Sequence, residues 1–198
     1  MAISDTVDFA LTLTEVDFRV LRHRHTETSR EAARRADVSE DRLAKAMALR
    51  DEVAPLLAVI PASRVLDVEG LRTRLHRPSL RLMTEQELEE TFFDCETGAV
   101  PPLGPDYRTP TVLDSRLTLE PDVYLEAGDQ VDLVHVSATS FRKLMRGTET
   151  LDCSIAAPQG KQDRLNDTEK LLQRRAKAVV VFRRREGLSS DFMRNIAA

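Results

Sequence analysis

The chain has 198 residues, of which 41% are hydrophobic and 31% charged, and its formal net charge is −4. This balance is typical of a soluble globular domain with a core of its own. It excludes a membrane-spanning chain, because no apolar run approaches the roughly 20 residues of a membrane helix. Residues 1–5 lack the basic and apolar regions of a secretion signal, so we expect a cytoplasmic protein.

The first half of the chain predicts short helices and strands. In chain order these are a helix over residues 4–13, a strand over 16–21, a helix over 28–36, a helical turn over 39–42, and two strands over 45–49 and 53–60 that pair as a hairpin. Ser4 or Asp5 can cap the first helix. Thr28 and Glu31 have the spacing of a capping box, which marks the start of the second helix. Pro55 favours an edge position or a strand start.

The second half continues in the same way up to residue 145. Its elements are a helix over 67–75, a short strand over 81–83, a helix over 84–92, strands over 110–113, 123–125 and 131–136, and a helix over 137–145. Asp67 can cap the first of these helices, and Thr84 with Glu87 forms a second capping box. In the last strand, apolar residues alternate with Asp132 and His135. Because the helices do not alternate strictly with long parallel strands, the pattern favours an α+β fold over a doubly wound one.

The character of the sequence changes after residue 154. Residues 156–160 have the composition of a linker, and residues 167–182 have the spacing of a basic amphipathic helix, although 179–182 could instead form a strand. Ten Lys or Arg and five Asp or Glu follow residue 160, so this segment carries +5 and residues 1–160 carry −9. We therefore predict a domain over residues 1–154 and a linker with a basic, helical C-terminal extension over 155–198.

Lys45 is the first residue of a predicted buried strand. Its neighbours Ala44, Ala46 and Met47 indicate apolar surroundings, in which a lysine is paired, serves a function or extends its ammonium to the surface. An ammonium held at such a place can stabilise a developing negative charge. A solvated lysine at the end of an element is the alternative, and such lysines are common.

Residues 98–105, with the sequence Gly-Ala-Val-Pro-Pro-Leu-Gly-Pro, form an ordered loop, because no helix persists at this density of proline and glycine. Pro101 and Pro102 have no N–H group, so they stiffen the loop and leave the amides of Gly98 and Ala99 as donors to an oxyanion. The alternative is a proline-rich connection without such a function.

The histidines and cysteines are weaker candidates. His23 and His25 lack a third ligand at a suitable spacing, and the two cysteines, Cys95 and Cys153, are too few for a zinc cluster or a disulfide framework. We therefore expect no metal, no cofactor and two free thiols. For Cys95 an ordinary apolar role is favoured over a reactive one.

Four further polar residues have simple structural explanations. Asp114 and Ser115 follow a predicted strand and could contact a substrate or form a turn. Ser137 and Ser140 fit helix caps better than nucleophiles. The sequence contains no Gly-x-Ser-x-Gly elbow, no Walker loop and no dinucleotide fingerprint, which leaves it without a motif for nucleophilic or nucleotide-dependent catalysis.

Three pairs of segments stand in an order and at a spacing that are typical of one protein family. They are residues 28–33 (Thr-Ser-Arg-Glu-Ala-Ala) with 39–45 (Ser-Glu-Asp-Arg-Leu-Ala-Lys), residues 57–61 (Leu-Ala-Val-Ile-Pro) with 66–67 (Leu-Asp), and residues 98–104 with 123–128 (Val-Tyr-Leu-Glu-Ala-Gly). Together they resemble the YbaK and prolyl-tRNA-synthetase-associated family of aminoacyl-tRNA editing domains. The resemblance covers residues 5–150.

The resemblance implies a mixed β-sheet that is partly closed into a barrel and surrounded by short helices. It implies hydrolysis of the ester that joins a small non-cognate amino acid to the 3′ end of tRNA, with prolyl-tRNA as one candidate. A ribose hydroxyl of the tRNA would help to activate the water. The implied partners are aminoacyl-tRNA and, as an open question, an aminoacyl-tRNA synthetase. Monomer and homodimer both remain open, and no cofactor or membrane is implied.

The resemblance also implies roles for individual residues. The family's catalytic positions fall on Lys45, its key lysine, and on Gly98 of the glycine-proline loop. Its substrate-binding positions fall on Thr28, Ala99, Pro101, Pro102 and Gly128. The family often has a glycine where this chain has Ala99, whose methyl group would narrow the space for the amino acid.

Two functions remain open from the sequence: an aminoacyl-tRNA deacylase, and a non-catalytic tRNA- or protein-binding module that keeps the fold. Lys45 and the Gly98 loop favour the enzyme, whereas Ala99 and the acidic residues 1–160 do not. The C-terminal extension either binds tRNA or packs as a solvated amphipathic helix. The tRNA-binding candidates in it are Lys170, Arg174, Arg175 and Lys177.

Overall fold

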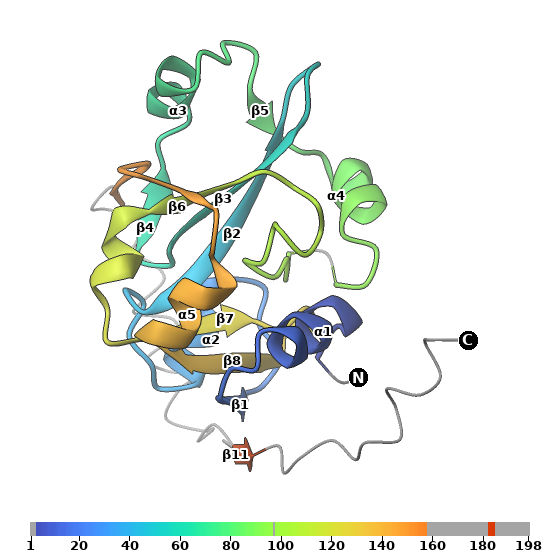
Figure 1. Cartoon of the computed structure of the whole chain (residues 1–198), viewed down its shortest axis with the longest axis vertical. Helices are drawn as coiled ribbons and strands as arrows, with labels where there is room; N and C mark the ends of the chain where they lie inside the picture. The colour runs from blue at the N-terminus through green and yellow to red at the C-terminus, as the bar shows by residue number, and fades with distance from the viewer. Residues whose placement is uncertain (1–2, 97, 158–181, 185–198) are drawn as a thin grey trace, which may run out of the picture.

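The computed structural model describes residues 3–96, 98–157 and 182–184 (Figure 1). The helices are α1 (Asp5–Leu13), α2 (Ser29–Arg35), α3 (Val68–Arg74), α4 (Glu85–Thr91), α5 (Ala138–Leu144) and the 3₁₀ helix η1 (Ser115–Leu119). The strands are β1 (Phe18–Arg22), β2 (Leu43–Arg50), β3 (Pro55–Pro61), β4 (Arg64–Leu66), β5 (Arg81–Leu82), β6 (Thr111–Asp114), β7 (Asp122–Glu126), β8 (Asp132–Ser137), β9 (Glu149–Leu151), β10 (Ser154–Ala156) and β11 (Phe182–Arg184). Among these described segments, no helix has the length and apolar character that crossing a bilayer requires.

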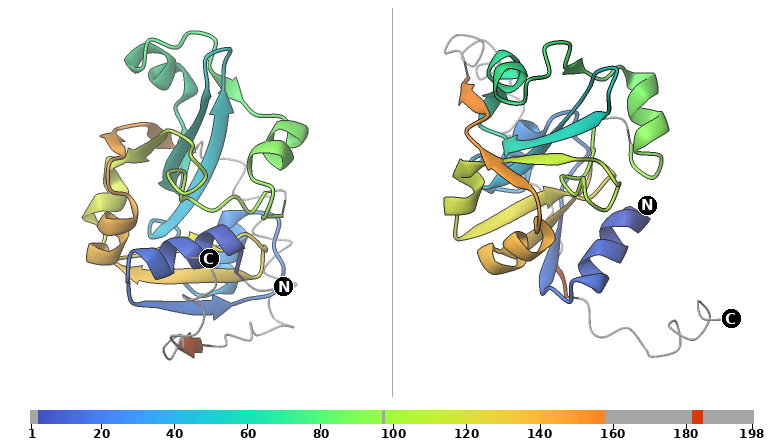
Figure 2. Two further views of the ribbon diagram at one scale, coloured as in Figure 1. Left: turned by 45° about the vertical axis from the view of Figure 1, so that its right-hand side comes forward. Right: turned by 45° about the horizontal axis from the view of Figure 1, so that its top comes forward.

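Most of the strands form one mixed sheet with the order β11-β1-β8-β7-β2-β3-β6-β9, and β5 pairs with the end of β2. The pairs β2–β7, β3–β6 and β6–β9 are parallel, whereas the other pairs in this sheet are antiparallel. Strands β4 and β10 form a separate antiparallel pair. The β2–β3 hairpin rises away from β1, β7 and β8, so the sheet turns strongly along its length (Figure 2). This mixed arrangement confirms the α+β class.

Each α-helix begins after a side chain that accepts a backbone N–H three residues later. These capping residues are Ser4, Thr28, Asp67, Thr84 and Ser137. At Thr84 the capping box is complete, because the Glu87 carboxylate accepts the Thr84 N–H at 2.8 Å. A cap of this kind stabilises a helix by about 1 kcal/mol. Thr28, Asp67 and Thr84 confirm the predicted caps. Of the alternatives that the sequence left, Ser4 rather than Asp5 caps α1, and Ser137 rather than Ser140 caps α5.

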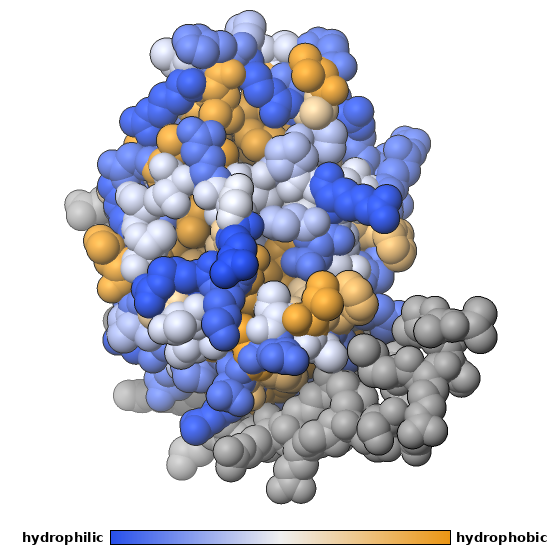
Figure 3. All heavy atoms as spheres, in the orientation of Figure 1, coloured by the Kyte–Doolittle hydropathy of each residue, from blue (hydrophilic) through white to orange (hydrophobic). Residues whose placement is uncertain are grey.

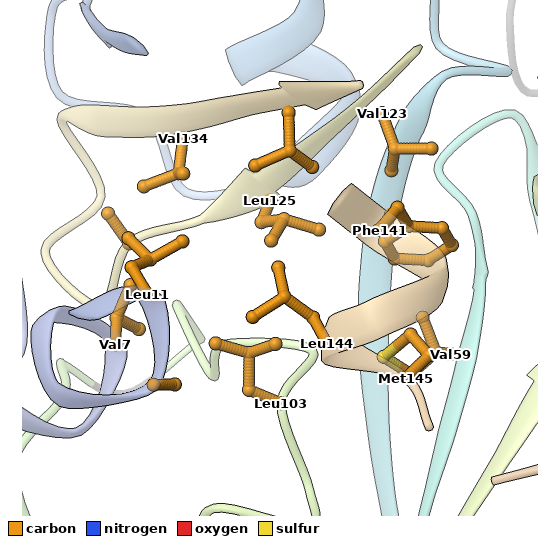
Figure 4. Packing of buried hydrophobic residues seen from close by; sticks show 14 of the residues in the cluster. Val7, Leu11, Val59, Leu103, Val123, Leu125, Val134, Phe141, Leu144 and Met145 are labelled. Atoms are coloured by element: carbon orange, nitrogen blue, oxygen red, sulfur yellow. The ribbon is translucent and has the colours of Figure 1, made fainter. Parts of the chain in front are cut away.

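Three hydrophobic clusters hold the elements together. In the largest, side chains of α1 and α5 converge with those of β7, β8 and the loop around Leu103 (Figure 4). A second cluster packs α3 against β2, β3 and β6, and a third packs α2 against β1, β2 and β8. Strand β2 contributes to all three: Ala44 and Ala48 to the first, Leu49 to the second and Leu43 to the third.

The elements that the sequence did not predict are short. Strands β4, β9 and β10 have three residues each, too few to show a period of two, and η1 directly follows β6. Residues 39–42 form the single turn that the sequence predicts: the Leu43 N–H donates to the Ser39 carbonyl at 3.2 Å, and the turn does not extend into a longer helix. Strand β10 ends at Ala156, two residues beyond the expected domain end at 154. Of the expected C-terminal helix, residues 167–181 lie outside the described residues, and Phe182 begins β11.

Hydrophilic side chains cover most of the face in Figure 3, and hydrophobic ones form small separate groups among them. The largest exposed hydrophobic residues come from different parts of the chain. They include Phe9, Leu13, Val53, Phe93 and Leu119. Scattered exposure of this kind is normal for folded proteins, so it does not by itself indicate a docking surface.

Candidate functional site

Lys45 lies on the face of β2 opposite the largest core, because its neighbour Ala44 packs into that core and side chains alternate along a strand. Burial and the nearby Arg30 guanidinium lower the pKa of the Lys45 ammonium, and the Glu40 carboxylate opposes this shift. Lys45 Nζ donates a hydrogen bond to the carbonyl oxygen of Arg64 at 3.1 Å. An ammonium has three N–H donors, so two remain available for a ligand as far as the described residues extend.

The turn between β3 and β4 brings two cations together. Arg30 donates hydrogen bonds to the carbonyl oxygens of Ala62, at 2.9 Å, and Ser63. Lys45 donates to the next carbonyl along the chain, that of Arg64. Two neighbouring cations, one of them partly removed from water, stabilise an anionic group that approaches them. Glu40 lies 3.4 Å from Arg30 Nε and compensates part of this charge.

The glycine-proline loop has an exposed start and a buried middle. Gly98 has a φ of +91°, a conformation that favours glycine, and its residue is exposed. Ala99 is 1% exposed, and its N–H already donates to the Glu96 carbonyl at 3.0 Å. Pro101 and Pro102 are buried. The Gly98 amide is therefore the better candidate for an oxyanion donor, and the Ala99 amide is engaged within the loop.

The turn after β7 lies beside this loop. The Glu96 N–H donates to the Gly128 carbonyl at 2.7 Å. Gly128 has a φ of +99°, and a Cβ on it would lie 2.8 Å from Ser4 Cβ and 3.2 Å from Cys95 Cβ. Only glycine fits such a position without strain. The structure thus brings together two expected site residues, Gly98 and Gly128.

No hydrogen bond or ion pair within the described part of the chain joins Lys45 directly to the Gly98 loop. The first turn of α2 contacts both regions instead. Arg30 reaches the β3–β4 turn beside Lys45, and Ser29 hydrogen-bonds to Glu126, the last residue of β7. The start of α2 therefore contacts both the turn beside Lys45 and the end of β7 that precedes Gly128.

Two buried carboxylates beside Gly128 were missed by the sequence reasoning. Glu126 is 5% exposed, and burial raises its pKa to about 7 although the hydrogen bond with Ser29 acts in the opposite direction. Burial also raises the pKa of Asp129, whose Oδ1 accepts the Asp132 N–H at 2.8 Å. A carboxyl group that titrates near neutrality is able to exchange protons during a reaction. The available signal was a pair of acidic residues flanking a glycine between apolar strands.

The weaker candidates have structural partners. His23 is buried with Nδ1 2.7 Å from the Arg24 carbonyl oxygen, whereas exposed His25 has Nε2 4.0 Å from the Glu96 carboxylate. Thr28 is exposed, and its hydroxyl accepts the Glu31 N–H at 3.2 Å as the cap of α2. In the part of the chain that the structure describes, no group of three or more His, Cys, Asp or Glu is arranged to hold a metal ion.

Cys95 and Cys153 are both free. Burial raises the pKa of each thiol to about 12. A thiol of this kind is protonated near neutral pH and is a poor nucleophile. The four basic residues expected to contact tRNA lie outside the described residues; they are Lys170, Arg174, Arg175 and Lys177.

Comparison with solved structures identifies relatives of the same fold. A candidate trans-editing enzyme for prolyl tRNA synthetase has a TM-score of 0.66 and 23% identity over 78% of this chain and 100% of that one. The hypothetical protein APE2540 has a TM-score of 0.66 and 24% identity over 76% and 100%. A candidate signal transduction protein from Marinobacter aquaeolei VT8 has a TM-score of 0.61 and 23% identity over 86% of this chain but 36% of that one. At these identities the similarity concerns the fold.

Sequence comparison identifies the family. No curated protein matches the chain. The family model described as the aminoacyl-tRNA editing domain matches residues 23–144. This segment is more than half of the chain, and it contains Lys45, the Gly98 loop and Gly128. The chain belongs to the aminoacyl-tRNA editing domain family.

Proposed function

We propose that the chain is a trans-editing deacylase that removes a small non-cognate amino acid from the 3′ end of a mischarged tRNA. The family match carries the proposal, because residues 23–144 include the whole candidate site from Lys45 to Gly128. The proline tRNA carrying a wrong amino acid is the first substrate to test, since one solved structure of this fold is a candidate trans-editing enzyme for prolyl tRNA synthetase. An aminoacyl-tRNA synthetase is the candidate protein partner.

The reaction breaks the bond between the carbonyl carbon of the amino acid and a ribose oxygen. Water attacks the carbonyl carbon, the carbonyl oxygen becomes an oxyanion, and the ribose oxygen leaves with a proton. We assign the stabilisation of the oxyanion to the Lys45 ammonium and the Gly98 amide. The neighbouring ribose hydroxyl of the tRNA orients and activates the water, so no side-chain nucleophile is needed.

The environment of Lys45 supports this role. Its lowered pKa reflects the loss of water around the ammonium. A cation that is partly removed from water attracts a developing negative charge more strongly than one in bulk solvent. The hydrogen bond to the Arg64 carbonyl fixes the ammonium before the reaction, so little reorganisation is required in the transition state.

Replacing Lys45 tests the proposal. We expect Lys45→Ala to slow hydrolysis of the proline tRNA mischarged with alanine, cysteine or serine by at least about 100-fold, the effect of losing one electrostatic contact to a transition state. The melting temperature should stay close to that of the wild type. The rate is measured as release of labelled amino acid in single-turnover reactions. Lys143→Ala, at an exposed position in α5, is the matched control and should retain the wild-type rate.

Two outcomes would contradict the proposal in different ways. Hydrolysis at the wild-type rate by folded Lys45→Ala would remove Lys45 from the mechanism. A wild-type protein that binds mischarged tRNAs and hydrolyses none of them would be a non-catalytic binding module, the second function that the sequence leaves open.

A further inference from the structure

A buried carboxylate lies at the start of a chain of polar contacts that leads to Lys45. Asp114, the last residue of β6, is 0% exposed. Its carboxylate accepts hydrogen bonds from the amide of Arg116 at 3.1 Å, the amide of Cys153 at 3.2 Å and the hydroxyl of Ser154 at 2.6 Å. The Arg116 guanidinium donates to it as well, at 3.1 Å. These donors fix the position of the Asp114 carboxylate beside the start of β10.

The hydroxyl of Ser154 connects Asp114 with Arg64. Arg64 Nε donates to Ser154 Oγ at 2.8 Å, and Arg64 Nη2 donates to the Ser154 carbonyl at 3.1 Å. A guanidinium only donates hydrogen bonds. The single hydroxyl hydrogen of Ser154 is therefore directed to Asp114, and the direction of the chain of contacts is fixed from Arg64 through Ser154 to Asp114.

Arg64 presents its main chain to Lys45. The side chain of Arg64 is bound to Ser154 of β10, and the main-chain carbonyl oxygen of the same residue accepts the hydrogen bond from Lys45 Nζ. It belongs to the three-residue strand β4, whose strand partner is β10 in a sheet separate from the main one. The cross-strand residues Val65 and Ile155 are exposed, whereas Arg64, Leu66 and Ser154 share the opposite face of the pair. On that face the contacts of the Arg64 side chain with Ser154 add to the pairing of the two strands. A displacement of β10 therefore displaces the acceptor of Lys45.

We propose that Asp114, Ser154 and Arg64 are positioning residues for Lys45, and that β10 is thereby a functional part of the editing site. The inference rests on the proposed function of Lys45. Ser154 lies beyond the segment 23–144 that the family model matches, and directly before the extension that the sequence predicts from residue 155. The site accordingly requires a strand that neither the family model nor the sequence assigns to it.

The test combines activity with a direct observation of Lys45 in the full-length chain. Ser154→Ala removes the hydroxyl that joins Arg64 to Asp114. We expect kcat for mischarged tRNA to fall by about 10–100-fold with KM within about twofold, because a catalytic group displaced by about 1 Å loses rate without losing substrate contacts. Ser79→Ala is the matched control, since the Ser79 hydroxyl contacts Glu52 on the surface.

The second readout is the NMR titration of the Lys45 side chain. The chain has five lysines, so the spectrum contains few lysine Cε signals. The signal that is absent in Lys45→Arg is assigned to Lys45. In Ser154→Ala the titration midpoint of Lys45 should move in either direction, because the ammonium loses its acceptor or exchanges it for water. A merely structural role of Ser154 would lower the melting temperature and leave this midpoint in place.

Each outcome separates the inference from the proposed function. A midpoint that is unchanged in Ser154→Ala overturns the positioning role whatever the activity, and a moved midpoint with unchanged kcat overturns its catalytic relevance. If Ser154→Ala does not fold, Arg64→Lys keeps the charge and the carbonyl but loses the two-donor fork, and the same criteria apply. If wild-type protein hydrolyses no mischarged tRNA, the proposed function fails, while the titration still decides whether β10 positions Lys45.

Discussion

The ionisation of Glu126 makes the stability of the folded protein depend on pH. An ordinary glutamate titrates near pH 4.5, whereas burial raises the pKa of Glu126 in the folded chain to about 7. Below pH 4.5 the group is protonated in both the folded and the unfolded state. Between pH 4.5 and 7 the unfolded state releases this proton to water, whereas the folded state retains it because burial disfavours the charged form. The stability associated with this group is therefore present at low pH and is lost as the pH rises to 7.

Glu126→Gln should remove this dependence. We compare the free energy of unfolding of the variant with that of the wild type. The difference in favour of the variant should grow by up to about 3 kcal/mol between pH 4.5 and 7, and it should stay constant above pH 7. Glutamine can still accept the hydrogen bond from Ser29. The measurement is chemical denaturation at a series of pH values.

The control for this prediction is Glu89→Gln, which changes an exposed carboxylate of α4. Asp129 also has a raised pKa, but it is present in both proteins and its contribution largely cancels in the difference. Parallel stability curves for wild type and Glu126→Gln would mean that Glu126 is solvated in the folded protein.

The strand over 131–136 shows why single polar residues were misplaced by the sequence reasoning. Its alternation predicts that Asp132 faces away from the core, yet Asp132 is 2% exposed. It pairs with Arg22 of β1 through two contacts of 2.8 and 2.6 Å. Both faces of β8 are covered, by α1 on one side and α2 on the other. The period of a strand indicates which residues share a face, and it does not indicate whether a distant strand supplies a counter-charge.

At the scale of elements, the sequence predicts correctly those features that depend on interactions between residues close together in the chain. Caps such as Thr84 and turns such as the proline-rich loop depend on neighbouring residues, and these were predicted correctly. The pairing of β4 with β10 depends on residues that are 90 positions apart, Arg64 and Ser154, and three-residue strands carry no period. The sequence therefore proposed Lys45 as a site residue but gave no signal for its contact with Arg64.

We predict that the glycine-proline loop affects, through Ala99, which amino acid the protein accepts. Ala99→Gly removes a methyl group and should extend acceptance toward larger amino acids. A methyl-sized change in a close pocket alters relative kcat/KM by roughly 10–200-fold. The measurement is the ranking of deacylation rates over tRNAs that carry a graded series of amino acids, from alanine and serine upward.

A buried alanine elsewhere separates selection from stability. Ala58 of β3 is 0% exposed and lies in a different cluster, so Ala58→Gly loses a buried methyl away from the loop. Both variants should lose some stability. If Ala99→Gly loses stability like Ala58→Gly and keeps the wild-type ranking of substrates, the Ala99 methyl belongs to the core and does not face the amino acid.

At the scale of the whole molecule, charge is divided along the chain. Residues 1–160 carry −9 and residues 161–198 carry +5. An acidic body repels the phosphate backbone of tRNA, so tight binding requires a positive region elsewhere. The described part of the C-terminal segment, β11, pairs with β1 at the edge of the main sheet. The segment therefore has two candidate roles, in tRNA binding and in completing the sheet.

Truncation after Gly160 and a variant with reduced charge distinguish these roles. In the second variant, Lys170, Arg174, Arg175 and Lys177 are all replaced by glutamine, which keeps β11 and the chain length. If the four residues contact phosphates, both variants should bind tRNA more weakly, and the slope of log K against log salt should become shallower by roughly 3, at 0.7–0.9 per contact. Hydrolysis of a minimal aminoacyl ester, which has no tRNA body, should survive in both.

The structural role predicts a different pattern for the same two variants. Truncation alone would then lower the melting temperature or change the oligomeric state, because it removes β11 and leaves the outer edge of β1 unpaired. The glutamine variant, which retains this strand, would keep the wild-type affinity for tRNA and its salt dependence. Since an exposed strand edge is a site of association between copies, size measurement of the truncated protein at several concentrations shows whether β11 protects that edge.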